Sequence, residues 1–220
     1  MENIIFCSSP FQVLVAKEVV QTVSEDFIGI YLKMSNDTRQ TFYAERMAEF
    51  CKEVIVLEGK TVLSDIQEAL KDRSIRNIYL ASLDNPVALS IFNPSTMNLY
   101  TFDDGSTSIV PLNLYTQNLE RVIPYTNFTL REVMSLSNRH YTVFEDCILF
   151  PKEKQVFLKL HLEPSHFHRA KNGKKISIFL GQFLGSLLYQ EDLELTQKLT
   201  AKVLDEQKID YYYPHPRVPL

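Results

Sequence analysis

The first hundred residues alternate short apolar runs with helical patterns, and this alternation restricts the fold more than any other feature of the chain. The apolar runs have the length of strands and lie at residues 4–7, 27–32, 53–57, 77–81 and 98–102. Helix starts or amphipathic segments separate them. Strands that alternate with helices are typical of a doubly wound, largely parallel sheet. The sequence therefore predicts an α/β fold.

Polar residues follow three of these predicted strands. They are Ser8-Ser9, Ser82 and Asp84, and Asp103-Asp104. Right-handed crossovers place all strand-to-helix turns of such a sheet at one edge, where ligands bind. We therefore expect these residues to face a common crevice. Neither the Gly-x-Gly-x-x-Gly dinucleotide motif nor a Gly-x-x-x-x-Gly-Lys-Ser/Thr phosphate loop occurs in the chain.

The acid pair Asp103-Asp104 admits two interpretations. A carboxylate at the carboxyl end of a strand is placed to act on a substrate. The same residues, followed by Gly105, are also ordinary turn formers, because Asp side chains accept backbone N–H groups and glycine tolerates positive φ. The local pattern leaves both interpretations open.

A second α/β unit is predicted from residue 175 onward. It contains a strand at residues 176–180, a helix at 190–207 and a strand at 209–213. The last strand ends in Pro214-His215-Pro216-Arg217, where two prolines stiffen the backbone around the imidazole. Histidine and arginine can both bind a phosphate, but an exposed strand end would show the same residues.

Other residues of this unit are weaker candidates for a site. Gly181, after the first of these strands, either lets a ligand approach closely or makes a turn. Glu191 and Asp192 at the start of the helix either belong to a site or stabilise the helix dipole. Three histidines at positions 161, 166 and 168 match no metal motif, so residues 151–174 are predicted to be a solvated linker. The expected organisation is a domain at 1–150, this linker, and a second unit at 175–220.

Composition excludes several classes of protein. A net charge of −4 gives no basic face for nucleic acid. Three widely spaced cysteines without a Cys-x-x-Cys pair indicate neither disulfides nor a cysteine zinc site, which fits a reducing compartment. No signal peptide and no apolar run of about eighteen residues is present, so we expect a cytoplasmic protein without a transmembrane segment.

Two motifs, taken in order, carry a resemblance to a known family. Residues 101–106 (Thr-Phe-Asp-Asp-Gly-Ser) and 213–217 (Tyr-Pro-His-Pro-Arg) resemble the acidic and His-Pro motifs of bacterial sialyltransferases. The chain more particularly resembles glycosyltransferase family 52, the lipooligosaccharide alpha-2,3-sialyltransferases. Stretches at 77–83, 140–144 and 178–182 are similar to that family as well, so the likeness covers most of the chain.

The resemblance implies a GT-B architecture of two Rossmann-like domains with the active site in the cleft between them. It implies an inverting, metal-independent transfer of sialic acid from CMP-sialic acid to a galactose hydroxyl of a bacterial surface glycan, such as lipooligosaccharide or capsule. CMP-sialic acid would be the donor substrate, and no cofactor is expected. The enzyme would work in the cytoplasm or at the inner face of the membrane.

The resemblance also assigns roles to residues. A carboxylate must take the proton of the attacking hydroxyl, and Asp104 is the first choice, with its neighbour Asp103 second and Asp192 in reserve. His215 would donate to the departing phosphate. The expected nucleotide-side residues are Gly181, Gln182, Pro216 and Arg217.

The chain ends three residues after Arg217, whereas the resemblance implies a longer nucleotide-binding domain. The second unit is therefore expected to be truncated, and to pack on the first domain or to form a homodimer through the strand at 209–213. Two alternatives remain open. One is a non-catalytic binding or assembly module, and the other is a related transferase with a different nucleotide-sugar donor.

Overall fold

The computed structural model describes residues 1–33, 38–59, 61–111, 113–161, 178–180, 198, 201–207 and 210–213. The chain divides into two compact units, Met1–Leu162 and Glu163–Leu220. Within the described residues, no helix is both long enough and apolar enough to cross a membrane.

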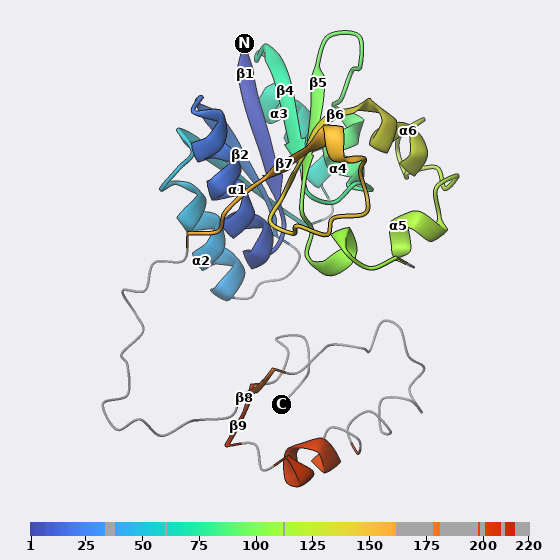
Figure 1. Cartoon of the computed structure of the whole chain (residues 1–220). Helices are drawn as coiled ribbons and strands as arrows, with labels where there is room; N and C mark the ends of the chain where they lie inside the picture. The colour runs from blue at the N-terminus through green and yellow to red at the C-terminus, as the bar shows by residue number, and fades with distance from the viewer. Residues whose placement is uncertain are drawn as a thin grey trace. The chain divides into compact units, whose positions relative to one another are not determined.

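The first unit is built on a seven-stranded parallel sheet (Figure 1). Its strands are β1 (Glu2–Cys7), β2 (Phe27–Lys33), β3 (Glu53–Glu58), β4 (Ile75–Leu80), β5 (Asn98–Phe102), β6 (Ser137–Thr142) and β7 (Gln155–Phe157). The spatial order is β3-β2-β1-β4-β5-β6-β7. The order therefore reverses between β1 and β4, and this switch point is where doubly wound sheets bind ligands.

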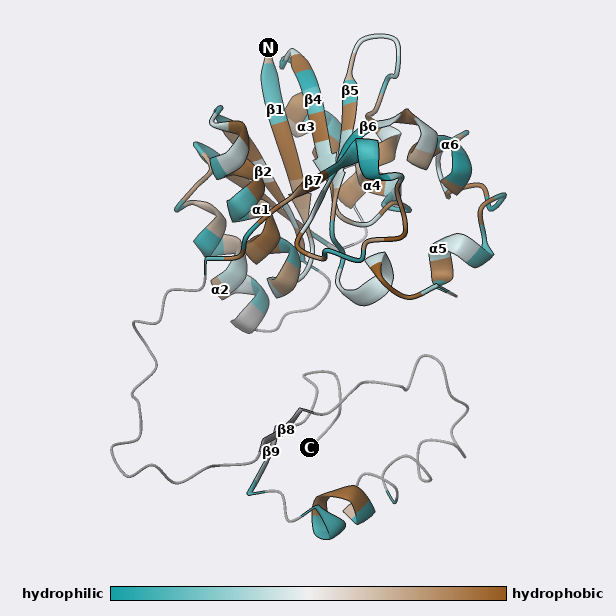
Figure 2. Ribbon diagram, in the orientation of Figure 1, coloured by the Kyte–Doolittle hydropathy of each residue, from teal (hydrophilic) through white to brown (hydrophobic). Residues whose placement is uncertain are grey.

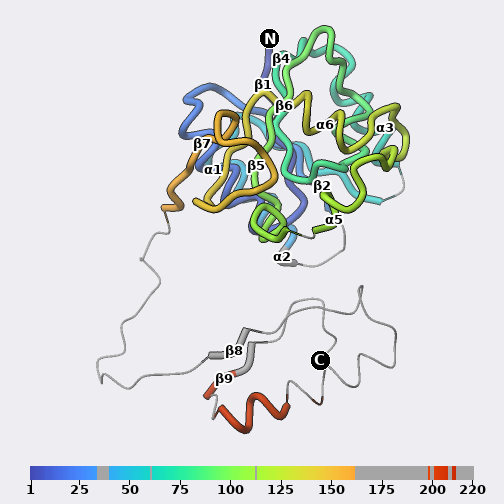
Figure 3. The backbone as a smooth tube through the Cα atoms, turned by 45° about the vertical axis from the view of Figure 1, so that its right-hand side comes forward, coloured from blue at the N-terminus to red at the C-terminus, as the bar shows by residue number. Residues whose placement is uncertain are grey.

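Helices cover both faces of this sheet (Figures 1 and 3). The first group, α1 (Pro10–Val23) and α2 (Thr38–Met47), packs on one face. The second group packs on the other face and comprises α3 (Val62–Leu70), α4 (Pro86–Ser90), α5 (Leu114–Gln117) and α6 (Leu130–Leu136). Two short 3-10 helices complete the unit, η1 (Ser106–Ser108) and η2 (Lys152–Lys154).

The central strands are buried on both faces, which explains their nearly continuous apolar sequence. Along β1, Ile4 and Phe6 join the apolar cluster on the α3 side, whereas Ile5 and Cys7 join the cluster on the α1 side. Figure 2 shows the resulting hydrophobic colouring along the inner strands. Two cores on one sheet thus account for the strand signal in the sequence.

The helix starts follow the expected capping chemistry. Ser9 caps α1 and accepts a hydrogen bond from the backbone N–H of Gln12, with Pro10 in the first turn. Asn85 caps α4 in the same way, and Pro86 follows it. With these caps, α1 begins three residues after the end of β1, and α4 begins soon after β4, at the carboxyl edge of the sheet.

The five strands predicted between residues 4 and 102 are all present. Residues 140–144, one of the stretches similar to the family, overlap β6. The strand β7 was not predicted. Its three residues pair with β6, and the first compact unit extends to Leu162. A strand of this length is too short to give a recognisable pattern, and only pairing with a preformed neighbour stabilises it.

In the second unit, β8 (Ile178–Leu180) and β9 (Tyr211–Tyr213) form a parallel pair, and residues 201–206 are helical. Both strands lie within the strands predicted at residues 176–180 and 209–213. A parallel pair requires a crossover connection, as the predicted strand-helix-strand order supplies.

Truncation of Ile30 should show how much the sheet depends on its buried strands. Ile30 lies in β2 with no exposed surface, so Ile30→Ala should lower the free energy of unfolding by about 2–5 kcal/mol. Val56→Ala on the neighbouring strand β3, where the side chain is exposed, should cost less than about 1 kcal/mol. Urea unfolding measures both, and equal losses would contradict this account of the core.

Candidate functional site

Three polar side chains meet where β1, β4 and β5 end. Ser8 follows β1, Ser82 follows β4, and Asp104 follows β5. These strands are neighbours at the switch point of the sheet, so their carboxyl ends open on the same edge. The common edge predicted for the three turns is therefore present.

The carboxylate of Asp104 is the centre of this group. Its Oδ2 accepts hydrogen bonds from the Ser82 hydroxyl at 2.7 Å and from the Tyr115 hydroxyl at 3.2 Å. Its Oδ1 accepts a hydrogen bond from the side-chain amide of Gln12. The side chain is partly exposed, so a carboxylate held by three donors still reaches the surface.

Gln12 joins the three strand ends. Its Oε1 accepts the backbone N–H of Ser8 at 2.6 Å, and its Nε2 lies 3.3 Å from the Ser82 hydroxyl as well as against Asp104. The side chain is 3% exposed. Sequence reasoning missed this residue, although the Ser9-Pro-Phe-Gln12 spacing is that of a capping box and marks Gln12 as a side chain that turns back toward the strand end.

Tyr115 reaches the site from the less regular middle of the chain. It lies on α5, which Asn113 caps through a capping box with Thr116. Burial, and secondarily the negative charge of Asp104, raise the pKa of Tyr115 far above its usual value, so its hydroxyl stays protonated and donates. No local pattern identified Tyr115, because a four-residue helix carries no periodicity.

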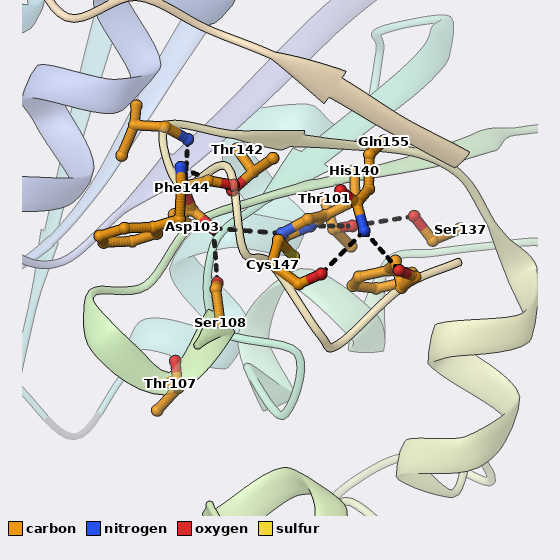
Figure 4. Close-up of polar contacts among 12 residues, drawn as sticks. Thr101, Asp103, Thr107, Ser108, Ser137, His140, Thr142, Phe144, Cys147 and Gln155 are labelled. Carbon is orange, nitrogen blue, oxygen red and sulfur yellow. Dashed lines mark hydrogen bonds and ion pairs between the residues drawn. The ribbon is translucent and has the colours of Figure 1, made fainter. Parts of the chain in front are cut away.

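The neighbouring acid, Asp103, has a different environment (Figure 4). Its side chain has no exposed surface. Oδ1 accepts the Ser108 hydroxyl and lies 3.2 Å from Nε2 of His140, and Oδ2 accepts the backbone N–H of Val143 at 2.7 Å. A carboxylate so enclosed does not reach a substrate, and it instead ties the turn after β5 to the end of β6.

His140 extends this buried network. Its Nδ1 lies 3.0 Å from the hydroxyl of Thr101, which in turn is 2.9 Å from the hydroxyl of Ser137. The ring stacks on Phe150 with 4.4 Å between centroids. Each polar atom of the ring therefore has a partner inside the protein, as burial requires.

Burial by itself would lower the pKa of His140, but its interactions with Asp103 and Cys147 outweigh burial, and the net effect is a raised pKa. At Cys147, burial raises the thiol pKa, and the contacts with His140 and with the backbone of Leu149 and Phe150 together more than offset this, so the net shift is downward. The raised pKa of His140 favours the charged imidazole, and the lowered pKa of Cys147 favours the thiolate.

The two acids of this turn therefore form their hydrogen bonds on different sides. Asp103 bonds toward β6, and Asp104 bonds toward the ends of β1 and β4. Gly105 follows with φ of 88°, a conformation that residues with a Cβ rarely adopt. Both sequence interpretations of the acid pair thus describe part of the turn: one acid stabilises it, and the other is presented at the ligand-binding edge.

An open cavity of about 490 Å³ adjoins the Asp104 group. Ser8 and Ser82 belong to both. The rest of its lining combines apolar and polar side chains: Leu32, Lys33, Leu57, Gly59, Val62, Asp84, Asn85, Pro86 and Val87. Its size and mixed lining are those of a small-molecule site.

Two of the residues that line this cavity, Lys33 and Asp84, take part in ion pairs. Lys33 forms an ion pair with Glu58 at 3.2 Å, and Asp84 accepts a hydrogen bond from Arg121 at 2.5 Å. The apolar wall and these polar groups together can hold a ring that carries hydroxyl groups.

The remaining predicted site residues lie outside the described part of the chain. They are Gly181, Gln182, Asp192, His215, Pro216 and Arg217. Among the described residues, no three or more His, Cys, Asp or Glu side chains are grouped to hold a metal ion. Of the three clustered histidines only His161 is described, and its ring contacts Glu18 at 2.9 Å.

The fold and the site define an α/β protein that presents a carboxylate at the switch point of a doubly wound sheet. The model of glycosyltransferase family 52 matches residues 24–218, and the chain belongs to this family. The resemblance drawn from the motifs is thereby confirmed.

Two curated relatives align with nearly the whole chain. It is 26% identical over 233 residues to the CMP-N-acetylneuraminate:beta-galactoside alpha-2,3-sialyltransferase of Pasteurella multocida (strain Pm70), covering 98% of this chain and 73% of the relative. It is also 26% identical over 236 residues to the N-acetyllactosaminide alpha-2,3-sialyltransferase of Haemophilus influenzae (strain ATCC 51907 / DSM 11121 / KW20 / Rd), covering 97% and 73%.

The His140–Asp103 pair predicts a pH dependence of stability. Because the pKa of His140 is raised on folding, its stabilisation is fully present below the unfolded-state pKa near 6.5 and is lost as pH rises through the higher folded-state value. The free energy of unfolding of the wild type should therefore fall over this range relative to His140→Gln. Parallel curves for the two proteins would contradict the prediction, and His161→Gln, at an exposed ring, is the control.

Proposed function

We propose that this protein transfers sialic acid from CMP-sialic acid to a galactose hydroxyl of a bacterial surface glycan, with inversion and without a metal ion. The observation that carries the proposal is the Asp104 carboxylate, held by Gln12, Ser82 and Tyr115 beside a cavity, in a member of glycosyltransferase family 52. Two relatives that align over nearly its whole length are named alpha-2,3-sialyltransferases.

Asp104 is the proposed general base. In an inverting transfer the acceptor oxygen attacks the anomeric carbon, its proton passes to a carboxylate, and the bond to the CMP phosphate breaks. A carboxylate offers about four acceptor positions, and the three donors on Asp104 leave about one of them, on Oδ1. That position suits the acceptor hydroxyl. Asp103 is buried and its carboxylate bonds within the turn, which supports Asp104 as the base of the pair.

The cavity beside Asp104 is the proposed acceptor site. Its apolar wall, with Leu32, Leu57 and Val87, suits the face of a sugar ring, and Asp84 and Asn85 suit its hydroxyl groups. Its volume leaves room for more than one ring, consistent with a galactose-terminated glycan rather than a free monosaccharide.

The donor side of the proposal rests on the family resemblance and on a GT-B architecture of two Rossmann-like domains. His215 would donate to the departing phosphate, and Arg217 would hold its oxygens. Gly181, Gln182 and Pro216 would lie along the nucleotide. Asp192 is the reserve base from the same part of the chain.

Asp104→Asn tests the base. The amide cannot take a proton, so lactose-dependent release of CMP from CMP-sialic acid should fall by about 10²–10⁴-fold, while the thermal shift produced by CMP stays as in the wild type. Asp146→Asn, at an exposed acid, is the control. Wild-type turnover in Asp104→Asn, with turnover lost in Asp192→Asn, would move the role of base to Asp192.

The donor is tested with the wild-type chain in the same assay. Lactose-dependent CMP release and a thermal shift by CMP support the proposal. A shift with UDP or GDP and none with CMP would indicate a different nucleotide-sugar donor. No release and no shift with any of them would overturn the transferase and favour a binding module.

His215→Ala tests the proposed role at the leaving group. Removal of the imidazole should lower the rate of CMP release by about 10²-fold or more, because negative charge on the phosphate then lacks its donor. His161→Ala, which removes the exposed ring of another histidine, should leave the rate near that of the wild type. Equal rates for wild type and His215→Ala would remove His215 from the mechanism.

A further inference from the structure

We infer that an open cavity at the ends of β6 and β7 binds a second, uncharged sugar ring of the acceptor glycan. This β6–β7 cavity has a volume of about 340 Å³, and six residues line it: Thr142, Phe144, Glu145, Lys152, Gln155 and Phe157. The inference rests on the proposed transfer to a glycan, and it holds whichever residue takes the proton of the acceptor hydroxyl. It adds a second subsite to the cavity beside Asp104.

The β6–β7 cavity lies at the same edge of the sheet as Asp104. β6 ends at Thr142 and β7 ends at Phe157, and these two residues are partners in the parallel pair. Neighbouring strands lie about 4.8 Å apart, so the ends of β5 and β7, two strands apart, are separated by about 10 Å. A glycan whose terminal galactose lies beside Asp104 can therefore extend to the β6–β7 cavity.

Hydrogen bonds hold the walls of this cavity in place (Figure 4). The buried carboxylate of Asp103 accepts the backbone N–H of Val143 at 2.7 Å. The hydroxyl of Thr142 accepts the backbone N–H of Phe144 at 3.1 Å, and its carbonyl accepts the backbone N–H of Leu158 at 2.7 Å. Because the backbone on both sides is bonded before a ligand arrives, binding costs little ordering of the chain.

Two phenyl rings supply the apolar part of the cavity. Phe157 is 56% exposed, and Phe144 is half-buried, with its ring stacked on Phe11 at 6.4 Å between centroids. The face of a phenyl ring is weakly negative, so it attracts the weakly positive C–H groups on the face of a sugar ring. The rings therefore suit a ligand with an apolar face and polar edges.

Polar groups beside the rings can bond the hydroxyls of such a ligand. The Nε2 of Gln155 donates to the carbonyls of Cys147 at 3.0 Å and of Phe150 at 2.5 Å. This fixes the amide and leaves Oε1 as an acceptor, to which no donor among the described residues bonds. Lys152 uses one of its three N–H groups on the carbonyl of Glu145 at 2.7 Å, and the carboxylate of Glu145 belongs to an exposed residue.

The charges of the lining favour an uncharged ligand. The carboxylate of Glu145 and the ammonium of Lys152 are the two charged groups among the six lining residues, and they balance. A quaternary ammonium would suit the phenyl rings but would meet the cation of Lys152. A nucleotide phosphate or a sialic acid would meet the anion of Glu145. A neutral hexose or N-acetylhexosamine ring meets neither repulsion.

Phe157→Ala and Glu145→Gln test the subsite at two different groups. The first removes an exposed phenyl ring and the second removes the negative charge of an exposed residue. Ile148→Ala and Glu153→Gln make comparable changes at exposed residues outside the lining and are the matched controls. The measurements are the melting temperature and KM in the CMP-release assay, with lactose and with a neutral tetrasaccharide in which N-acetyllactosamine is linked to lactose.

We expect the wild type to have a KM for the tetrasaccharide about 3- to 10-fold below its KM for lactose, because only the longer glycan reaches the second cavity. Phe157→Ala and Glu145→Gln should each remove most of this advantage, with KM for lactose and the melting temperature near those of the wild type. Both controls should keep it. Equal KM values in the wild type, or an advantage that survives in either variant, would overturn the inference. An equal rise of KM for both acceptors would show a merely structural effect and would also overturn it.

Binding without the donor separates failure of this inference from failure of the proposed function. Saturation-transfer NMR between the protein and the tetrasaccharide requires neither CMP-sialic acid nor turnover. If the wild type releases no CMP with either acceptor, the proposed function falls, and the NMR signal alone decides the subsite. A signal that is lost in Phe157→Ala and kept in Ile148→Ala supports the subsite, and a signal that is absent from the wild type or equal in these two variants overturns it. If CMP is released with equal KM for both acceptors, only the inference falls.

Discussion

The site of this protein depends on the burial of one carboxylate. Asp103 has no exposed surface, so each of its oxygens must be bonded inside the protein, and its partners come from η1, from β6 and from the segment just after β6. These bonds determine the path of the turn after β5. The next residue, Asp104, is thereby directed to the ends of β1 and β4, where Gln12 and Ser82 hold it.

The two acids illustrate how one short motif can carry stability and function together. Asp103 stands against a histidine whose pKa is raised, and the pair lies inside the sheet edge. Asp104 receives only neutral donors and keeps some exposure. A carboxylate with neutral donors and an open acceptor position is suited to take a proton, whereas one enclosed beside a histidine of raised pKa is suited to hold a turn.

The strands were predictable because each has to be apolar on both faces of a covered parallel sheet, and the caps at Ser9 and Asn85 were predictable because they are local. The strand β7 was not, since its stability comes from pairing with β6. Of the site, Asp104 and Ser82 followed from their places at strand ends. Gln12 and Tyr115 did not, because their contacts with Asp104 join positions 92 and 11 residues apart.

By itself the sequence determined the α/β class, the positions of the main strands and the family, because hydrophobic periodicity, capping residues and short motifs are properties of neighbouring residues. Only the tertiary structure decided which acid of the pair is buried and which is presented, and which side chains hold the presented one. The physical reason is that burial and hydrogen-bond partners depend on where strand ends meet in space, and the order of the strands in the sheet differs from their order in the chain.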